Sequence, residues 1–354
     1  MPAEDVSTFC RKRSYAKQKG ACSLAVHKDG RFRKEDYLTR RNFVFTGIGL
    51  PGLFAASALG ASKAKITVGI TVDTRPDWNG PQNFIRSLDE ASAVGYHRVE
   101  TFWPYVERWQ HDPQGLKDVL ASRNLTLETV SNGGQMRTDF GDPSQRAGVI
   151  EDHMKLVNFI HQFGCDHLKI NCGRRQHVTG AAKAQMLAEM SRTFDEIGER
   201  MNALGMKFGI HAHLDSNFQT RDEIDAVLGQ TNPKYVHFVL DTGHITMAGM
   251  DPVELTRKYV SRIIEFHVKD CAPRDRGGYK GPPLKPGTYN TTAENRVFYE
   301  LGKGGVDFPG IVKILDRNSW EGWFTLELDR TATTAKNSCT ISKAYLENVL
   351  MLKI

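Results

Sequence analysis

The most constraining feature of this chain is a regular alternation of short β-branched runs with longer amphipathic stretches, which begins near Lys65. The runs have the length and composition of buried strands, and the stretches between them have helical periodicity. The predicted strands are 66–71, 97–101, 125–130, 167–171, 207–213, 235–240, 263–268 and 323–328. The predicted helices are 82–95, 114–123, 144–163, 181–204, 221–229, 252–259, 307–316 and 340–353. Such alternation predicts a parallel sheet with helices outside it.

The ends of three predicted helices support this organisation. Gly95, Gly164 and Gly205 each follow a helical stretch, and the next strand begins at once. Glycine in this position adopts the left-handed conformation that ends a helix. Eight strand–helix units in about 290 residues predict an α/β fold of the (β/α)8 TIM barrel type over residues 65–354. A doubly wound open sheet is the alternative, but residues 71–76 lack its GxGxxG phosphate turn.

Residues 1–64 are predicted to be a targeting segment outside the barrel. Arg40-Arg41 precedes an apolar run at 46–59, and small residues follow at 58–64. This order is typical of a twin-arginine signal peptide, which exports folded proteins. A membrane anchor is the weaker alternative, because the apolar run is shorter than the ~20 residues that a transmembrane helix needs. We therefore expect an exported, periplasmic protein without stable membrane association after signal cleavage.

The distribution of charge argues against a nucleic-acid partner. The formal net charge is +6, and residues 1–41 carry eleven basic and five acidic residues, so the whole excess lies there. The remaining chain is neutral, whereas nucleic-acid binding needs a basic surface. The four cysteines of this part have no CxxC spacing, and we expect single buried thiols. The oligomeric state is not revealed, and a homo-oligomer is compatible with the sequence.

A long polar insertion lies between the seventh predicted strand and its helix. Residues 271–305 include two arginines, Arg274 and Arg276, and several glycines and prolines. Loops of this length in a compact barrel are usually functional, although a disordered surface loop is the alternative. Loops that follow barrel strands lie on the catalytic face, so we expect this one to be a lid over the site.

Polar side chains stand at the ends of the predicted strands, where barrel enzymes place their catalytic groups. These residues are Glu100, Lys169, Asn171, His211, His213, Asp241, His244, His267, Lys269, Glu327 and Asp329. Period-two alternation puts His211 and His213 on one face of their strand. It does the same for His267 with Lys269 and for Glu327 with Asp329. If these faces point inward, imidazoles and carboxylates converge from four adjacent strands.

A mixed set of imidazoles and carboxylates suits a divalent ion such as Mn²⁺, Co²⁺, Fe²⁺ or Zn²⁺. Each residue also has an ordinary structural role. His213 could be a hydrogen-bonded core residue, Asp241 a helix cap, and Lys269 part of a solvated ion pair. One shared site is the simpler interpretation, because the residues recur at one topological position. His161 and His167 are expected at a helix end and in a loop.

Several motifs resemble those of one known superfamily. They are Asp241-Thr242-Gly243-His244, His267-Val268-Lys269-Asp270, the stretch Leu301–Phe308 and the closing Phe324-Thr325-Leu326-Glu327. In this order they resemble the xylose-isomerase-like barrel superfamily, which includes sugar (phosphate) isomerases and epimerases, inosose dehydratase and AP-endonuclease-type enzymes. The similarity spans about residues 65–354. It implies a xylose-isomerase-like TIM barrel, and the motifs identify the superfamily better than the substrate.

By this resemblance, Asp241, His267 and Glu327 are metal ligands. The family's usual fourth ligand is a Glu at the end of the fifth strand, but this chain has His211-Ala212-His213 there, as the inosose-dehydratase-like branch tends to. The fourth ligand is therefore His211, His213 or a loop residue such as Gln219. The same departure weakens an assignment to the two-glutamate ketose epimerases.

The resemblance implies a divalent-metal-dependent isomerase or epimerase that acts on a free keto-sugar or sugar derivative through an enediolate. Glu100, Glu327 and His213 are candidates for the base, Lys169 or His244 for the acid, and Lys269 is a further candidate catalytic residue. The same first step followed by loss of a substituent gives the alternative, a lyase or dehydratase that acts on an inosose or a 3-keto-glycoside. A non-catalytic sugar-binding barrel is the third interpretation.

Two further expectations follow from these motifs. The AP-endonuclease members carry extra histidines near the ends of strands two and three, and this chain has none there, which disfavours a nuclease. The expected partner is a small carbohydrate. Aromatic residues near the site are candidates for stacking on sugar faces, namely Phe102, Trp103, Tyr105, Phe218 and Tyr289.

Overall fold

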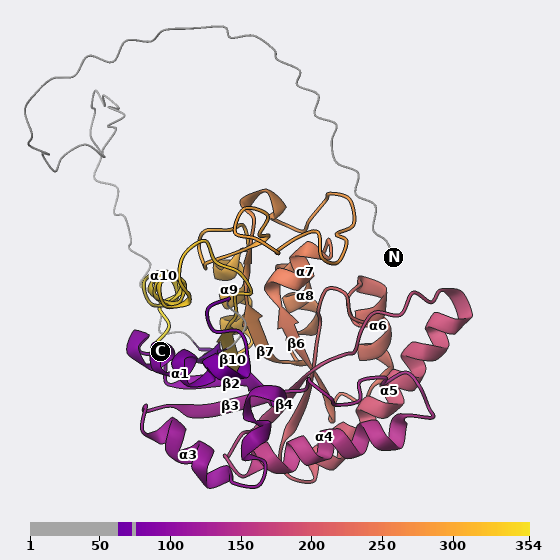
Figure 1. The fold of residues 1–354 in the computed structure, drawn as a ribbon. Coiled ribbons are helices and arrows are strands. Elements are labelled where there is room, and N and C mark those ends of the chain that lie inside the picture. The colour runs from indigo at the N-terminus through magenta and orange to yellow at the C-terminus, as the bar shows by residue number, and fades with distance from the viewer. Residues whose placement is uncertain (1–62, 73–75) are drawn as a thin grey trace, which may run out of the picture. The chain divides into compact units, whose positions relative to one another are not determined.

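The computed structural model describes residues 63–72 and 76–354. Eight parallel strands form a nearly closed barrel, and the helices lie around its outside (Figure 1). The predicted TIM barrel is therefore confirmed. The predicted twin-arginine signal lies outside the described residues and stays a prediction. Among the described residues, no helix has both the length and the apolar character that crossing a membrane requires.

The barrel strands follow the order β3-β2-β1-β10-β7-β6-β5-β4 around the sheet. They are β1 (Lys65–Thr71), β2 (Arg98–Phe102), β3 (Thr126–Ser131), β4 (His167–Asn171), β5 (Lys207–His211), β6 (Val236–Asp241), β7 (Ile263–Val268) and β10 (Glu321–Leu326). The main outer helices are α1 (Phe84–Val94), α3 (Pro113–Ala121), α4 (Arg146–His161), α5 (Gly180–Asn202), α6 (Arg221–Gln230), α8 (Pro252–Tyr259), α9 (Phe308–Arg317) and α10 (Ala335–Asn348). Shorter elements are α2 (Trp103–Val106), α7 (Thr242–Met247) and the 3-10 turns η1 (Pro81–Asn83), η2 (Glu107–Trp109) and η3 (Pro273–Asp275).

The junction between β3 and β4 is closed by side chains instead of a backbone ladder. The Thr129 hydroxyl donates to the carbonyl of His167 (2.9 Å). The Asn132 amide nitrogen donates to the carbonyl of Asn171 (3.1 Å), and its oxygen accepts from the Asn171 backbone N–H (2.8 Å). These bonds satisfy backbone groups that would otherwise be unpaired at two sheet edges.

Local sequence signals account for most of the element boundaries. The three glycines predicted to end helices are confirmed, with φ angles of 97° at Gly95, 76° at Gly164 and 74° at Gly205. The cysteines of the described part are buried, as expected, namely Cys165, Cys172, Cys271 and Cys339.

Three details differ from the sequence-based expectation. The strand β5 ends at His211, two residues early, because the chain turns there into a loop in which the Phe218 carbonyl accepts from the N–H of His213 (3.2 Å). The unpredicted helix α7 begins directly after β6 because Asp241 caps it. His167, expected in a loop, begins β4 and is buried inside the barrel.

The insertion between β7 and α9 is more ordered than a plain loop. Its two ends pair as a short antiparallel ribbon of β8 (Asp270–Cys271) and β9 (Phe298–Tyr299). The Asp270 carboxylate accepts hydrogen bonds from the backbone N–H groups of Cys271, Gly302, Gly304 and Val306 at 2.9–3.0 Å. One carboxylate thus fixes both ends of the insertion. In Figure 1 the orange loop lies at the end of the barrel where β6 and β7 finish.

Candidate metal centre and active site

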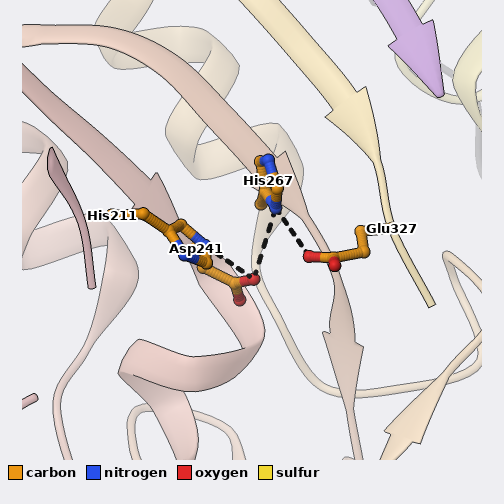
Figure 2. Close-up of side chains that lie close together, drawn as sticks. All are labelled: His211, Asp241, His267 and Glu327. Carbon is orange, nitrogen blue, oxygen red and sulfur yellow. Dashed lines mark hydrogen bonds and ion pairs between the residues drawn. The ribbon is translucent and has the colours of Figure 1, made fainter. Parts of the chain in front are cut away.

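Four predicted ligands lie together at the carboxyl ends of adjacent strands (Figure 2). His211 ends β5, Asp241 ends β6, His267 lies near the end of β7, and Glu327 directly follows β10. One potential ligand atom from each lies within 4.8 Å of the others, and all four side chains are buried. The structure therefore assembles from His211, Asp241, His267 and Glu327 a donor set that could hold one divalent cation.

Two buried atoms of this cluster lack hydrogen-bond partners, which is the observation that tests whether a cation fits. His211 Nδ1 lies 2.8 Å from Asn171 Oδ1, to which it donates, so Nε2 presents its lone pair to the cluster. Asp241 Oδ1 accepts from the N–H of His244 (2.7 Å), which leaves Oδ2. His211 Nε2 and Asp241 Oδ2 lie 3.5 Å apart, and neither has a hydrogen bond. Asp241 Oδ2 has the Lys269 ammonium 3.3 Å away, whereas His211 Nε2 has no hydrogen-bond partner among the described residues. Leaving such an atom unpaired costs about 1–3 kcal/mol, which a divalent ion would offset.

The protonation of His211 matches this role. Burial, together with the neighbouring Lys169 and His267, lowers the pKa of His211 well below its usual value. The imidazole is therefore neutral at neutral pH, and a neutral imidazole is the form that ligates a metal. Among the three candidates for the fourth ligand, His211 is the one that lies in the cluster. Gln219 instead accepts from the backbone N–H of Asp215 (2.8 Å).

His267 is held from both sides by carboxylates. Its Nδ1 lies 2.6 Å from Glu327 Oε2 and 3.9 Å from Asp241 Oδ2, while its Nε2 lies 2.8 Å from Glu100 Oε2. Burial opposes protonation, but Glu100 and Glu327 outweigh it and raise the pKa of His267 in the metal-free chain. A proton kept on Nε2 by Glu100 leaves Nδ1 for a cation, as carboxylates commonly orient metal-bound histidines.

Glu100 and Lys169 form a buried pair beneath this histidine. Lys169 Nζ lies 2.8 Å from Glu100 Oε1 and 5.0 Å from the centroid of the Phe102 ring. Both side chains are at most 1% exposed. The structure thus places these two predicted catalytic residues behind the donor set, where they support His267.

Lys269 lies among the carboxylates of the site. Its Nζ lies 3.0 Å from Glu327 Oε2, 3.3 Å from Asp241 Oδ2 and 3.1 Å from Asp329 Oδ1. Burial alone would lower its pKa, but the three carboxylates outweigh burial and raise it well above the usual value. Lys269 is therefore an ammonium ion that shares two carboxylates with the donor set.

His213 and His244 complete the site as two neutral imidazoles whose ring centroids are 3.6 Å apart. Burial lowers the pKa of both, and for His244 it is lowered well below the usual value. His213 Nδ1 donates to the carbonyl of Leu214 (2.5 Å). His244 Nε2 lies 3.1 Å from Lys269 Nζ and accepts from it, because the ammonium can only donate. The proton of the neutral ring is then on Nδ1, which lies 3.4 Å from the Leu214 nitrogen. His213 lies half-buried beside the donor set.

The insertion contacts residues around this site, and its role as a lid stays a prediction. The Tyr289 hydroxyl donates to Asp215 Oδ2 (2.9 Å), and the Asn290 amide donates to Asp329 Oδ2 (3.2 Å). The Phe298 ring lies 5.1 Å from the His244 ring. These contacts tie the insertion to the loops after β5 and β10.

The aromatic candidates divide into two groups. Phe218 packs on Phe238 in the core, and Trp103 packs edge-on against Phe159. Phe102 and Tyr105 instead line a cavity of about 450 Å³ beside Asp329 and Arg330. The remaining residues around this cavity are Asn79, Pro104, Gly133 and Gly134.

Sequence reasoning missed two buried carboxylates beneath the site. Glu265 lies two residues before His267 in β7, so strand periodicity gives it the same inward face. Glu128, in β3, is 1% exposed. Period-two parity around His267 was the signal that could have found Glu265. Barrel interiors are usually filled by branched apolar side chains, so charged residues there were not expected.

The fold agrees with the comparison to known proteins. Residues 88–351 match the family described as xylose isomerase-like TIM barrel, and the chain belongs to that family. The inosose dehydratase of Clostridium botulinum (strain Alaska E43 / Type E3) is 25% identical over 278 residues, which cover 76% of this chain and 89% of that protein. The inosose dehydratase of Lacticaseibacillus casei is 23% identical over 279 residues, with 76% and 89% covered.

Solved structures with the same fold are more distant in sequence. The IOLI protein with a zinc atom has a TM-score of 0.62 at 16% identity, and the match covers 80% of this chain and 98% of that one. D-Psicose 3-epimerase with D-tagatose from Clostridium cellulolyticum H10 has a TM-score of 0.62 at 13% identity, with 81% and 99% covered. The 3-keto-D-glucoside 4-epimerase from E. coli has a TM-score of 0.60 at 12% identity, with 80% and 100% covered.

Proposed function

We propose that this protein is a divalent-metal-dependent isomerase or epimerase that acts on a free keto-sugar or sugar derivative through an enediolate. The observation that carries the proposal is the convergence of four buried potential ligands beside a buried ammonium, with His211 Nε2 left without a hydrogen bond in the described part of the chain. The four are His211, Asp241, His267 and Glu327. When bound, a divalent ion such as Mn²⁺, Co²⁺, Zn²⁺ or Fe²⁺ polarises a substrate carbonyl and acidifies the adjacent C–H.

His213 is the base that the geometry favours. Its Nδ1–H is engaged by the Leu214 carbonyl, so Nε2 carries the lone pair. Its lowered pKa keeps the ring neutral at neutral pH, and it lies half-buried next to the donor set. Glu100 is a weaker candidate, because Lys169 and His267 already occupy its carboxylate. Glu327 is also engaged, by Lys269 and His267.

Lys269 is the acid that fits best, with His244 and Asp329 as positioning residues. The ammonium donates to His244 Nε2 and to Asp329 Oδ1, both at 3.1 Å, so these partners can hold it at the substrate when a metal takes Asp241 and Glu327. Lys169 is a weaker candidate, because its ion pair is with Glu100, which is not a member of the donor set, and it lies over the Phe102 ring. A protonated amine near a developing oxyanion stabilises the charge before it gives up the proton.

A lyase or dehydratase is the second candidate function. It shares the proton abstraction and differs in the loss of a β-substituent, for which Lys269 supplies the proton. The curated relatives described above are inosose dehydratases, and the replacement of the expected Glu by His211 in β5 favours this alternative. The cavity lined by Phe102 and Tyr105 would receive the part of a sugar derivative that extends beyond the reacting carbons.

The cellular setting remains part of the proposal. The twin-arginine motif at Arg40-Arg41 supports export to the periplasm, which favours a free sugar or an oxidised glycoside over a phosphorylated metabolite. A small carbohydrate is the proposed partner, and a non-catalytic sugar-binding barrel is the least favoured interpretation.

The test is solvent exchange. Metal-loaded protein is incubated in D₂O with a panel of free keto-sugars, inososes and 3-keto-glycosides, and deuterium at carbon is measured by NMR. Exchange with a rearranged product supports an isomerase or epimerase, and exchange with loss of water or of an aglycone supports a lyase. The His213→Gln variant is expected to lose exchange, whereas the matched variant His153→Gln, at a buried histidine outside the site, keeps it. Absence of exchange with every compound contradicts the proposal.

A further inference from the structure

A second group of ionisable side chains lies inside the barrel beneath the donor set. Glu128 of β3, His167 of β4 and Glu265 of β7 are all at most 1% exposed. One ligand atom from each lies within 4.8 Å of the others, and His167 Nε2 is 3.1 Å from Glu265 Oε2. The distance between His167 Nε2 and Glu265 Oε2 is about that between two ligand atoms of one metal ion when the metal–ligand bonds are 2.0–2.2 Å long.

His167 is oriented as a metal ligand is. Its Nδ1 lies 2.7 Å from Asp166 Oδ1, which holds a proton on that nitrogen, and its Nε2 faces Glu265 Oε2 at 3.1 Å, where a metal ion would replace the Nε2 proton. A carboxylate behind a histidine fixes both the tautomer and the ring orientation in many metal sites. The ring also lies 5.8 Å from that of Trp323, which holds it within the barrel.

Glu128 has a buried carboxylate oxygen, Oε2, without a hydrogen-bond partner among the described residues. The neighbouring strand makes room for this atom, because a Cβ at Gly69 would lie only 1.7 Å from it. A buried carboxylate oxygen without a partner is costly, so a ligand that fills this position would stabilise the barrel.

The other oxygens of the two carboxylates share one hydroxyl group. Thr325 Oγ1 lies 2.5 Å from Glu128 Oε1 and 2.5 Å from Glu265 Oε1, although its single proton can serve only one of them. Two buried carboxylates this close repel each other when both are ionised, and a cation between them would relieve that repulsion.

The ring of His167 faces a carboxylate on each side, Asp166 at Nδ1 and Glu265 at Nε2, so the cluster favours positive charge. A route from solvent exists as well. A cavity of about 220 Å³ at the amino ends of the strands is lined by Asp166, His167, Lys207 and Trp323, among others. This route does not pass through the proposed catalytic mouth.

We propose that Glu128, His167 and Glu265 form a second, inner binding site for a divalent transition-metal ion. The ion enters from the amino ends of the strands and stabilises the barrel. One imidazole and two carboxylates suit Zn²⁺ or Mn²⁺. The inner ion is structural, because its ligands are buried beneath the outer donor set. The site is independent of the proposed reaction and is tested by counting ions.

The experiment titrates metal-free protein with Zn²⁺, and separately with Mn²⁺, in equilibrium dialysis followed by elemental analysis. The wild-type chain is expected to retain two ions. Glu327→Gln, which weakens the outer set, and His167→Gln, which removes an inner ligand, are each expected to retain one. Glu128→Gln is a second inner variant, because it keeps the shape of the side chain should His167→Gln fail to fold. The control His153→Gln is expected to retain two.

The results separate the two proposals. One ion in the wild-type chain that Glu327→Gln removes and the inner variants keep overturns the inner site and leaves the proposed function intact. One ion that Glu128→Gln removes and Glu327→Gln keeps supports the inner site and contradicts the outer donor set. Thermal unfolding gives an independent readout: added Zn²⁺ is expected to raise the Tm of Glu327→Gln and to leave that of the double variant Glu128→Gln/Glu327→Gln unchanged.

Discussion

Lys269 competes with a metal ion for the outer donor set, and this competition gives a quantitative prediction. Its Nζ lies 3.0 Å from Glu327 Oε2 and 3.3 Å from Asp241 Oδ2, so a metal must share both oxygens with an ammonium or displace it. A unit charge 4 Å from a divalent ion costs about 8 kcal/mol at an effective dielectric constant of 20. Most of this cost is avoided when the Lys269 ammonium moves toward Asp329. If about 1.4–2.8 kcal/mol of the repulsion is left, it weakens metal binding ten- to hundredfold.

Lys269→Met is therefore expected to bind Mn²⁺ or Zn²⁺ ten- to hundredfold more tightly at the outer site. The same change destabilises the metal-free protein by about 3–5 kcal/mol, because it leaves buried carboxylates without their partner. That loss corresponds to a fall in Tm of roughly 10 °C. Excess metal is expected to recover most of this fall, because the ion replaces the missing positive charge.

Lys169→Met is the matched control. Lys169 is equally buried and also pairs with a carboxylate, but its partner is Glu100 and not a residue of the donor set. This variant is expected to lose similar stability without gaining metal affinity. Isothermal titration calorimetry gives the dissociation constants, and thermal melts with and without metal give the rescue. Equal affinities in Lys269→Met and the wild-type chain, or equal tightening in both lysine variants, would refute the reasoning.

Three further predictions concern the lid and a buried histidine. Asp270→Asn is expected to speed hydrogen exchange at the 302–306 amides, since an amide oxygen cannot accept all four hydrogen bonds; unchanged exchange contradicts this role. Tyr289→Phe removes the bond to Asp215 and should accelerate proteolysis within the insertion, whereas equal cleavage rates would mean that this bond does not hold it. Burial lowers the pKa of His153 to about 4, so an unfolded chain with a pKa near 6.5 takes up a proton first as the pH falls. The stability from this effect is complete above pH 6.5 and falls by about 3 kcal/mol by pH 4; urea unfolding of His153→Gln should show a shallower dependence.

Much of the fold was predictable because local and global signals agree. Glycines such as Gly95 end helices, the buried strands contain branched residues, and their order leaves few topologies other than a barrel. The donor set was predictable from parity, since Asp241, His267 and Glu327 occupy the same position in successive units. The choice of His211 over His213 was not predictable, because it depends on the residue at which β5 stops, and that is set by a loop contact with Phe218.

The buried carboxylates Glu128 and Glu265 could not be predicted from the sequence for a different reason. Glu128 and Glu265 alternate with apolar residues, a pattern that usually indicates a solvent-facing side of a strand. In a closed barrel, the side of the strand that carries these glutamates faces the interior. A buried charge there is stable only when side chains on other strands pair with it. The partner of Glu265, His167, is 98 residues away, and the partner of Glu128, Thr325, is 197 residues away, so no window of the sequence contains either pairing.

The side-chain junction between β3 and β4 links the shape of the barrel to the orientation of His211, one of the four potential metal ligands. Asn171 accepts there from the Asn132 amide through its carbonyl, and the same residue uses its side chain to fix the ring of His211. Every other neighbouring pair of strands in the described barrel is joined by a backbone ladder that resists separation. Any widening of the barrel is therefore expected to be greatest at Asn171 and to rotate the His211 imidazole that Asn171 orients. A perturbation that loosens the barrel would then also weaken the binding of a cation by His211.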